Sequence, residues 1–281
     1  AIFAEETNVT NECDTTYIKL DENLEPINYV NLTYDELVEK VGELETILET
    51  DAFQLYAVGD YTYKIENEED LEAFFRNKPD EQYIMEEFVV GDIYTYDAVC
   101  DSNGDPLFES SFRSPNVAET VNKGEDCFYY VTADVPEKLR ELGRKALKGF
   151  KVRSRFVHFE FFRLNEARKG LGEVGDYVGL EVNMRPAGGY TPDMMNFAHS
   201  ADVYQLYADM VVFNERRAPE WNEKFYCVYA GRKEGHTYTH THDEIMARYG
   251  ADIVMQEEMP PVNWPQMGRF MYTARLRTQE E

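Results

Sequence analysis

The chain has 281 residues, of which 43% are hydrophobic and 14% aromatic, a composition that supports a globular fold with a substantial core and excludes a disordered chain. Acidic residues number 54 against 28 basic residues, which gives a formal net charge of −26. A field of that sign argues against nucleic acid or an anionic membrane as the main partner. A polyanionic ligand would need a local metal ion, backbone amides or a few placed Arg and Lys side chains.

The cysteines indicate a reducing compartment. Cys13, Cys100, Cys127 and Cys227 are scattered along the chain without a C-x-x-C pair, as expected for ordinary thiols. The first residues, AIFAEETN, lack the basic and apolar regions of a signal peptide, and no apolar stretch reaches the length of a membrane span. The simplest expectation is a cytoplasmic protein.

Two helices are predicted in the first part of the chain. Thr33 and Glu36 form a capping box, and the apolar stripe that follows predicts a helix over 34–48. A second, shorter helix follows Asn67, with Asp70 at the capping-box position and with inward-facing side chains at Leu71, Phe74 and Phe75. The rest of residues 1–60 gives no clear pattern.

A β region and a helix come next. Strands are predicted over 83–90 and 93–99, and the sequence DSNGDP is a strong turn signal after which the chain returns over 107–112. A helix is predicted from Pro136, which suits the first helical position, to about residue 150.

Two alternating segments then predict a pair of half-buried strands, SRFVHFEFFRL at 154–164 and GLEVNMRP at 179–186. In the first, His158 and Glu160 share a face. In the second, Glu181, Asn183 and Arg185 share a face. If the strands pair across the loop at 165–176, Glu160, Glu181 and Asn183 converge. Oxygen ligands of this kind suit Mg²⁺ or Mn²⁺.

The alternative is a hairpin with one wet face, on which the acidic and amide side chains are only solvated. The neighbours of Glu160 favour the metal site over that alternative. Glu160 follows Phe159 and precedes Phe161 and Phe162, and a carboxylate in apolar company is costly unless it is paired or bound to metal.

A loop opens at Gly188 and leads to a helix predicted over 201–213. Residues 226–281 are predicted to form a small α+β unit, with a strand near 227–230, a helix capped by Thr241 and a last strand over 269–276. The segment RPAGGYTPDMM at 185–195 could shape a substrate pocket through backbone N–H groups or could be a plain connecting loop.

Three histidines lie in this part of the chain, His236, His240 and His242. Their placement on a predicted hairpin and helix cap favours a structural role over a zinc site.

The order of YIMEEFVVGDIYTYDAV, a Pro-started helix, RFVHFEFF and GLEVNMRPAGG resembles the ATP-grasp superfamily. More closely it resembles the carboxylate–amine or carboxylate–thiol ligases that include biotin carboxylase and D-alanine–D-alanine ligase. The resemblance implies an α+β fold, an antiparallel sheet with flanking helices and a small C-terminal α+β lid domain. It divides the chain into a shortened N-terminal segment (1–60), an ATP-grasp core (61–215) and a C-terminal subdomain (216–281).

The resemblance also implies roles for individual residues. Glu160, Glu181 and Asn183 match the ligands that hold Mg²⁺ (or Mn²⁺) against the ATP phosphates. Arg185 matches a basic residue that stabilises charge on the reacting groups. Arg113 follows a strand that faces the triphosphate, which leaves open a phosphate or substrate ligand and an exposed loop arginine. The stretch 85–89 matches the hinge, with Glu86, Glu87 and Val89 assigned there, and Asp92 could substitute for the ribose-binding glutamate that Ile93 replaces.

The implied function is ATP- and Mg-dependent joining of a carboxylate to an amine or thiol through an acyl phosphate, with release of ADP and phosphate. The partners would be small-molecule carboxylates and amines, without nucleic acid or membrane, and a homodimer is the oligomeric state suggested by related enzymes.

The chain departs from the family pattern before residue 65. A lysine in a V-K-P-like sequence and a Gly-rich phosphate loop are expected there, but the chain has FQLYAVGDYTYK, and Lys64 lies after the loop position. This departure keeps open a non-catalytic nucleotide- or metal-binding module derived from an ATP-grasp enzyme. A Ca²⁺-binding protein is a further alternative, against which the lack of a D-x-D-x-D-G loop counts.

Overall fold

A computed structural model describes residues 2–4, 17–20, 26–28, 55–58, 62–78, 84–115, 124–219 and 223–280. The chain divides into two compact units, each described by itself below. The large unit contains residues 92–163 and 177–281, and the small unit contains residues 2–91 and 164–176. The predicted helix over 34–48 lies outside the described residues.

The small unit has two three-stranded antiparallel sheets. The first pairs β1 (Ile2–Ala4), β2 (Tyr17–Leu20) and β3 (Pro26–Asn28), and the second has the order β5-β4-β6. Its strands are β4 (Leu55–Val58), β5 (Thr62–Ile65) and β6 (Ile84–Glu87). Helix α2 (Glu68–Asn77) begins where predicted, because the Asn67 side chain accepts a hydrogen bond from the Asp70 N–H.

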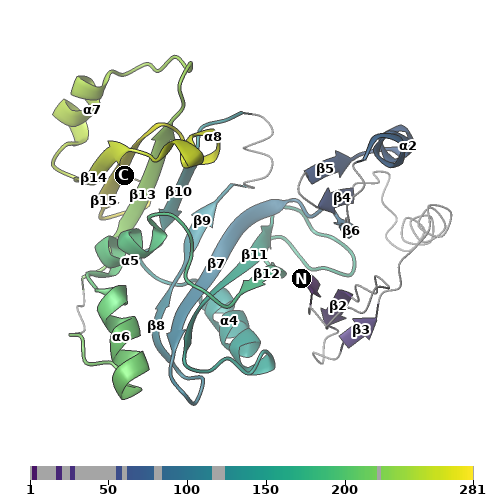
Figure 1. The fold of residues 1–281 in the computed structure, drawn as a ribbon, viewed down its shortest axis with the longest axis horizontal. Helices are drawn as coiled ribbons and strands as arrows, with labels where there is room; N and C mark the ends of the chain where they lie inside the picture. The colour runs from purple at the N-terminus through teal and green to yellow at the C-terminus, as the bar shows by residue number, and fades with distance from the viewer. Residues whose placement is uncertain are drawn as a thin grey trace. The chain divides into compact units, whose positions relative to one another are not determined.

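The large unit is built on a sheet of nine strands in the described chain, in the order β12-β11-β7-β9-β10-β13-β15-β14, with β8 paired to β7. Figure 1 shows β7 crossing the middle of this sheet. The strands are β7 (Gly91–Cys100), β8 (Pro106–Ser110), β9 (Phe112–Ser114), β10 (Phe128–Val131), β11 (Arg155–Leu164), β12 (Tyr177–Asn183), β13 (Tyr226–Arg232), β14 (Ile253–Glu258) and β15 (Phe270–Leu276).

Helices cover both faces of this sheet, and most residues of β7 and β11 are buried. Helix α4 (Glu137–Gly149) packs on one face through Leu139 and Leu147, against Tyr96 and Phe159. Helices α5 (Thr191–His199) and α6 (Val203–Phe213) pack on the other face through the second apolar cluster. The predicted fold class is confirmed: a mixed α/β chain with a mainly antiparallel sheet and flanking helices.

The C-terminal strands belong to the same sheet. Strand β13 pairs with both β10 and β15, so residues 226–276 extend the large sheet. Helix α7 (His242–Tyr249) has the predicted capping box between Thr241 and Glu244, and a 3-10 turn (Pro261–Asn263) and helix α8 (Trp264–Met267) precede β15. The domain boundaries predicted from the sequence stay a prediction.

Three details of the predicted elements were wrong. The strand predicted over 107–112 is two strands, β8 and β9, and helix α4 begins at Glu137 with Pro136 as its N-cap. The segment 185–195 is not all loop, because α5 begins at Thr191 with a proline in its first turn, a position that the missing proline N–H tolerates.

Candidate functional site

The carboxylate hairpin forms as predicted. Strands β11 and β12 pair antiparallel, with Glu160 opposite Glu181 and His158 opposite Asn183. Directly opposed residues point to the same face, so these four side chains share one face of the sheet. A bulge between Glu160 and Phe161 shifts the register immediately after the glutamate pair. Such bulges redirect side chains, and this one ends the shared face at Glu160.

A series of buried hydrogen bonds that begins on β7 fixes the position of the Glu160 carboxylate. Thr95 Oγ1 donates to Asp97 Oδ2 over 2.5 Å, and Asp97 Oδ1 lies 2.8 Å from His158 Nδ1. His158 Nε2 lies 3.0 Å from Glu160 Oε1. Thr95 and Asp97 are fully buried on β7, and the ring of Phe112 stacks on His158. The glutamate carboxylate is therefore oriented by a rigid series of side chains.

The charge of His158 follows from this arrangement. Burial lowers the pKa of the imidazole, but the carboxylates of Asp97 and Glu160 outweigh burial and raise the pKa to about 10. The ring is then a cation at neutral pH and donates to both carboxylates. The imidazolium thus places one positive charge between the carboxylates of Asp97 and Glu160. The carboxylate of Glu181, on the paired strand, is not one of its partners.

The donor set fits a hard divalent cation. Opposed carboxylates repel each other, and a cation between them removes that cost. Asn183 is half-buried, and its Nδ2 has no hydrogen-bond partner among the described residues, so its amide is not committed to another protein group. Within the described chain no group of three or more His, Cys, Asp or Glu side chains could hold a metal ion. Any metal here would depend on two carboxylates and the amide oxygen.

Arg113 and Asp92 are paired with each other. Arg113 Nη2 donates to Asp92 Oδ2 over 2.6 Å, and Nη1 donates to the Tyr130 hydroxyl over 3.2 Å. The hydrogen bond to Tyr130 and the Asp92 carboxylate raise the pKa of the guanidinium above its usual value, against the effect of burial. The motifs predict different roles for these two residues, whereas the structure joins them in one ion pair.

Arg185 lies beyond the strand that was predicted to carry it. Strand β12 ends at Asn183, and Arg185 is exposed in a bend where its guanidinium donates to the Pro186 carbonyl over 2.9 Å. The predicted alternation therefore stops two residues early, because the proline that follows cannot continue a ladder.

The predicted hinge residues lie in the other unit. Glu86 and Glu87 end β6, and half-buried Val89 follows that strand. They belong to the small unit, while Asp92 and the hairpin belong to the large unit. Lys64, on β5, pairs with Glu66 and lies over the Phe88 ring at 4.5 Å.

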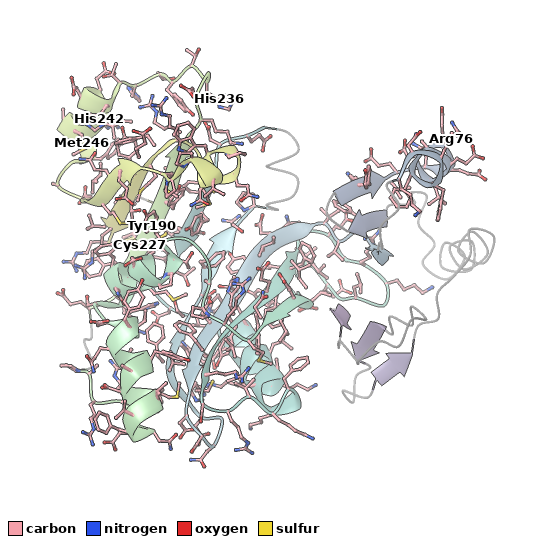
Figure 2. All side chains as sticks on the ribbon, in the orientation of Figure 1. Arg76, Tyr190, Cys227, His236, His242 and Met246 are labelled. Carbon is pink, nitrogen blue, oxygen red and sulfur yellow. The ribbon has the colours of Figure 1, made fainter. Side chains whose placement is uncertain are left out.

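The three C-terminal histidines have separate partners. His236 Nδ1 lies 3.0 Å from Asp126, and His242 Nδ1 lies 2.8 Å from the Tyr272 hydroxyl. His240 Nδ1 lies 3.8 Å from Glu244 within the capping segment. Figure 2 shows His236 and His242 well apart. Each of the three histidines therefore contacts a different side chain.

Thr95 and Asp97 are the site residues that sequence reasoning missed. Both are polar side chains in a strand that is otherwise almost wholly buried, and they alternate as YTYDAV. Burying an aspartate without a partner costs a large free energy. A buried aspartate therefore indicates that a cationic side chain lies close to it. The identity of that cation, His158, depends on the pairing of strands far apart in sequence.

Comparisons with known proteins place the fold. No family model matches the chain, and no curated protein matches it. Solved structures do match. Phosphoribosylglycinamide synthetase from Anaerococcus prevotii is 15% identical with a TM-score of 0.56, covering 90% of this chain and 64% of its own. L-amino acid ligase from Bacillus licheniformis is 14% identical with a TM-score of 0.57, covering 84% of this chain and 61% of its own.

A third structure was determined with nucleotide. The biotin carboxylase domain dimer of Hydrogenobacter thermophilus 2-oxoglutarate carboxylase, in complex with MgADP, ADP and bicarbonate, is 10% identical with a TM-score of 0.51. The match covers 85% of this chain and 56% of that one, so the chain spans less than two thirds of each of these structures. None of the helices in the described part of the chain is long and apolar enough to cross a membrane. The chain therefore shares the fold of these solved structures.

Proposed function

We propose that this chain binds ATP with Mg²⁺ and joins a carboxylate to an amine or thiol, releasing ADP and phosphate. The observation that carries the proposal is the opposition of Glu160 and Glu181 on one face of β11 and β12, with Glu160 held by the buried chain through His158. Glu181 is exposed and Glu160 half-buried, so a cation that enters from solvent could bind both carboxylates. The named neighbours support the reaction class, since a ligase, a synthetase and a carboxylase share the fold.

The hairpin side chains would hold the metal. Glu160, Glu181 and Asn183 would supply carboxylate and amide oxygens, and His158 would keep Glu160 in one rotamer. When bound, Mg²⁺ would neutralise the phosphate charge of ATP. We assign no further residue to the metal.

The remaining predicted residues are proposed contacts of nucleotide and substrate. Arg185 is exposed and has no carboxylate partner within the described chain, so its guanidinium is available to an anionic substrate group. Arg113 would contact a phosphate or the carboxylate substrate by exchanging the Asp92 carboxylate for that anion. Glu86, Glu87 and Val89 would hold adenine, and Asp92 would contact the ribose.

The proposed reaction balances as two displacements. An oxygen of the substrate carboxylate forms a bond to the γ-phosphorus as the bond to ADP breaks, and an acyl phosphate results. The amine nitrogen or thiol sulfur then forms a bond to the acyl carbon as phosphate leaves, and the nucleophile loses its proton. Positive side chains near the first displacement offset the repulsion between the carboxylate and the triphosphate.

Release of ADP tests this proposal. The purified chain is incubated with ATP, Mg²⁺ and pools of carboxylates and amines, and ADP is quantified by chromatography. We expect carboxylate-dependent ADP release that falls by two orders of magnitude or more in Glu181→Gln. Glu141→Gln, a matched charge removal on the exposed side of α4, should leave the release unchanged.

The second candidate is a nucleotide-binding module without turnover. The observation in its favour is the absence from the sequence of the V-K-P-like lysine and of a Gly-rich loop, with Lys64 paired to Glu66. Mg²⁺-dependent ADP binding without ADP release over the full panel would favour this candidate over the ligase.

A further inference from the structure

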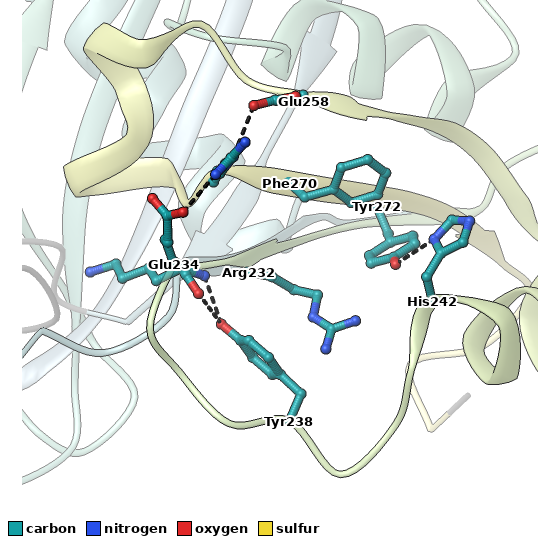
Figure 3. A pocket seen from close by; sticks show the side chains of 9 residues that line it. Arg232, Glu234, Tyr238, His242, Glu258, Phe270 and Tyr272 are labelled. Atoms are coloured by element: carbon teal, nitrogen blue, oxygen red, sulfur yellow. Dashed lines mark hydrogen bonds and ion pairs between the residues drawn. The ribbon is translucent and has the colours of Figure 1, made fainter.

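A cavity of 440 Å³ lies at the edge of the large sheet that is opposite the carboxylate hairpin. It is formed by the end of β13, by β15 and by the segment that joins β13 to α7 (Figure 3). Met271 belongs to the core beneath α5, so its neighbours Phe270 and Tyr272 point to the other face. The volume is in the range of small-molecule sites, about 300–1,000 Å³.

One side of the cavity is an aromatic wall. The rings of Phe270 and Tyr272 are 5.2 Å apart, and the His242 imidazole stacks on Tyr272 with an interplanar angle of 25°. A hydrogen bond between His242 Nδ1 and the Tyr272 hydroxyl, 2.8 Å long, fixes that stack. Tyr272 is buried beneath this stack, so the accessible rings of the wall are those of His242 and Phe270, against which a planar group can lie.

The opposite side is fixed by Tyr238. Its hydroxyl donates to Asp126 Oδ1 over 2.7 Å and accepts from the Lys233 N–H over 2.6 Å. The joining segment is therefore attached to the body of the unit at both ends, through Tyr238 and through His242. A site that is formed before its ligand arrives loses less free energy to ordering on binding.

A guanidinium without a counter-ion faces this space. The guanidinium of Arg232 lies over the Tyr238 ring at 4.0 Å, and its Nη2 donates to the His240 carbonyl over 3.0 Å. No carboxylate pairs with Arg232 in the described part of the chain. Figure 3 shows this side chain extending between Tyr238 and the pair formed by His242 and Tyr272.

The two acids that line the cavity have another partner. Arg269 donates to Glu258 over 2.9 Å and to Glu234 over 2.6 Å. Both glutamates thus pair with Arg269, and neither pairs with Arg232. The chain has a net charge of −26. Even so, this cavity contains an arginine, Arg232, that pairs with no carboxylate in the described chain and lies beside aromatic rings.

We propose that this cavity binds a small molecule with a planar ring and an anionic group, either carboxylate or phosphate. The ring would lie against His242 and Phe270, and the anion would accept hydrogen bonds from Arg232, whose planar fork suits both anions. The proposal does not depend on the metal hairpin, which occupies the other edge of the sheet.

Ligand-observed NMR titration of the full chain without Mg²⁺ tests the proposal with three probes. Benzoate carries a planar ring and a carboxylate, phenyl phosphate carries a planar ring and a phosphate, and cyclohexanecarboxylate carries a carboxylate on a puckered ring. Each probe is titrated against the wild type and against Arg232→Gln, Arg232→Lys and Arg248→Gln. Arg248 is exposed on α7 and does not line the cavity, so its variant is the matched charge control.

Saturable binding of at least one planar probe is expected, with several-fold weaker binding of cyclohexanecarboxylate. Arg232→Gln should raise the Kd at least about tenfold, the effect of losing a charge-assisted hydrogen bond, while Arg232→Lys has a smaller effect and Arg248→Gln none. Preference for benzoate or for phenyl phosphate identifies the anion. Thermal melting confirms that each variant is folded. No saturable binding of any probe, or equal Kd values for the wild type and a folded Arg232→Gln, would overturn the proposal.

Discussion

At the scale of single residues, the site is organised around His158. The imidazole lies between Asp97 and Glu160 and is almost wholly buried. It is the cationic partner of both carboxylates. The proposed ligand Glu160 has a defined direction because of this contact. Arg113 is similarly committed to Asp92, whereas Arg185 is exposed. The residues of the proposed site therefore differ in how far protein contacts fix their side chains before a ligand binds.

The charge of His158 predicts a pH dependence of stability in the metal-free chain. Its folded pKa of about 10 lies above an unfolded value of about 6.5, so its stabilisation is complete below pH 6.5 and decreases as pH rises to about 10. Urea unfolding in the presence of chelator should show this loss, with a slope of up to ~1.4 kcal/mol per pH unit.

His158→Gln is the comparison that isolates this residue. It should be less stable than the wild type near pH 6.5, and the difference should narrow as pH approaches about 10, because other titrating groups are common to both chains. A difference that is constant across this range would contradict a charged imidazole between the two carboxylates.

At the scale of elements, the hairpin depends on β7, and β7 depends on α4. Tyr96 is fully buried between α4 and the sheet, and its hydroxyl donates to Glu109, which Arg144 also contacts. Gly143 lies on the helix directly above the Tyr96 ring. A Cβ at this position would lie 2.2 Å from the nearest ring carbon. The glycine is required for the close approach of helix and strand.

Gly143→Ala should therefore destabilise the large unit. The added methyl group must displace a buried ring, and overpacking of this kind costs about 1–3 kcal/mol, more than the helix propensity gained by alanine. Urea unfolding measures the change, with Gly188→Ala as a matched control because no atom lies within 4 Å of its added Cβ. Equal stability of the two variants would show that α4 can move away from β7 without cost.

The local parts of this structure were predictable, and the long-range parts were not. The capping of α2 by Asn67 and of α7 by Thr241 follows from neighbouring residues, and the β11–β12 hairpin follows from two alternating segments that succeed each other in the chain. Helix α5 could have been found from the proline in its first turn. The contact of Asp97 with His158 spans 61 positions, and no pattern near either residue indicates the other.

At the scale of the whole molecule, the order of the strands in the large sheet determines long-range contacts that the sequence pattern did not predict. Strands β9, β10, β13 and β15 are neighbours in one sheet although they come from distant parts of the chain. This order makes the C-terminal strands part of the large sheet and places the cavity beside Arg232 at the edge opposite the hairpin. The net charge of −26 makes any bound polyanion dependent on local cations, which we propose are Mg²⁺ and a few arginines.

Calorimetric titration of the chain with ADP, with and without Mg²⁺, tests the metal and nucleotide site most directly. We predict binding that requires Mg²⁺ and that weakens at least tenfold in Glu181→Gln, while Glu141→Gln binds as the wild type does. Binding of equal strength without Mg²⁺, or an unchanged Kd in a folded Glu181→Gln chain, would contradict the assignment of Glu160 and Glu181 to the metal.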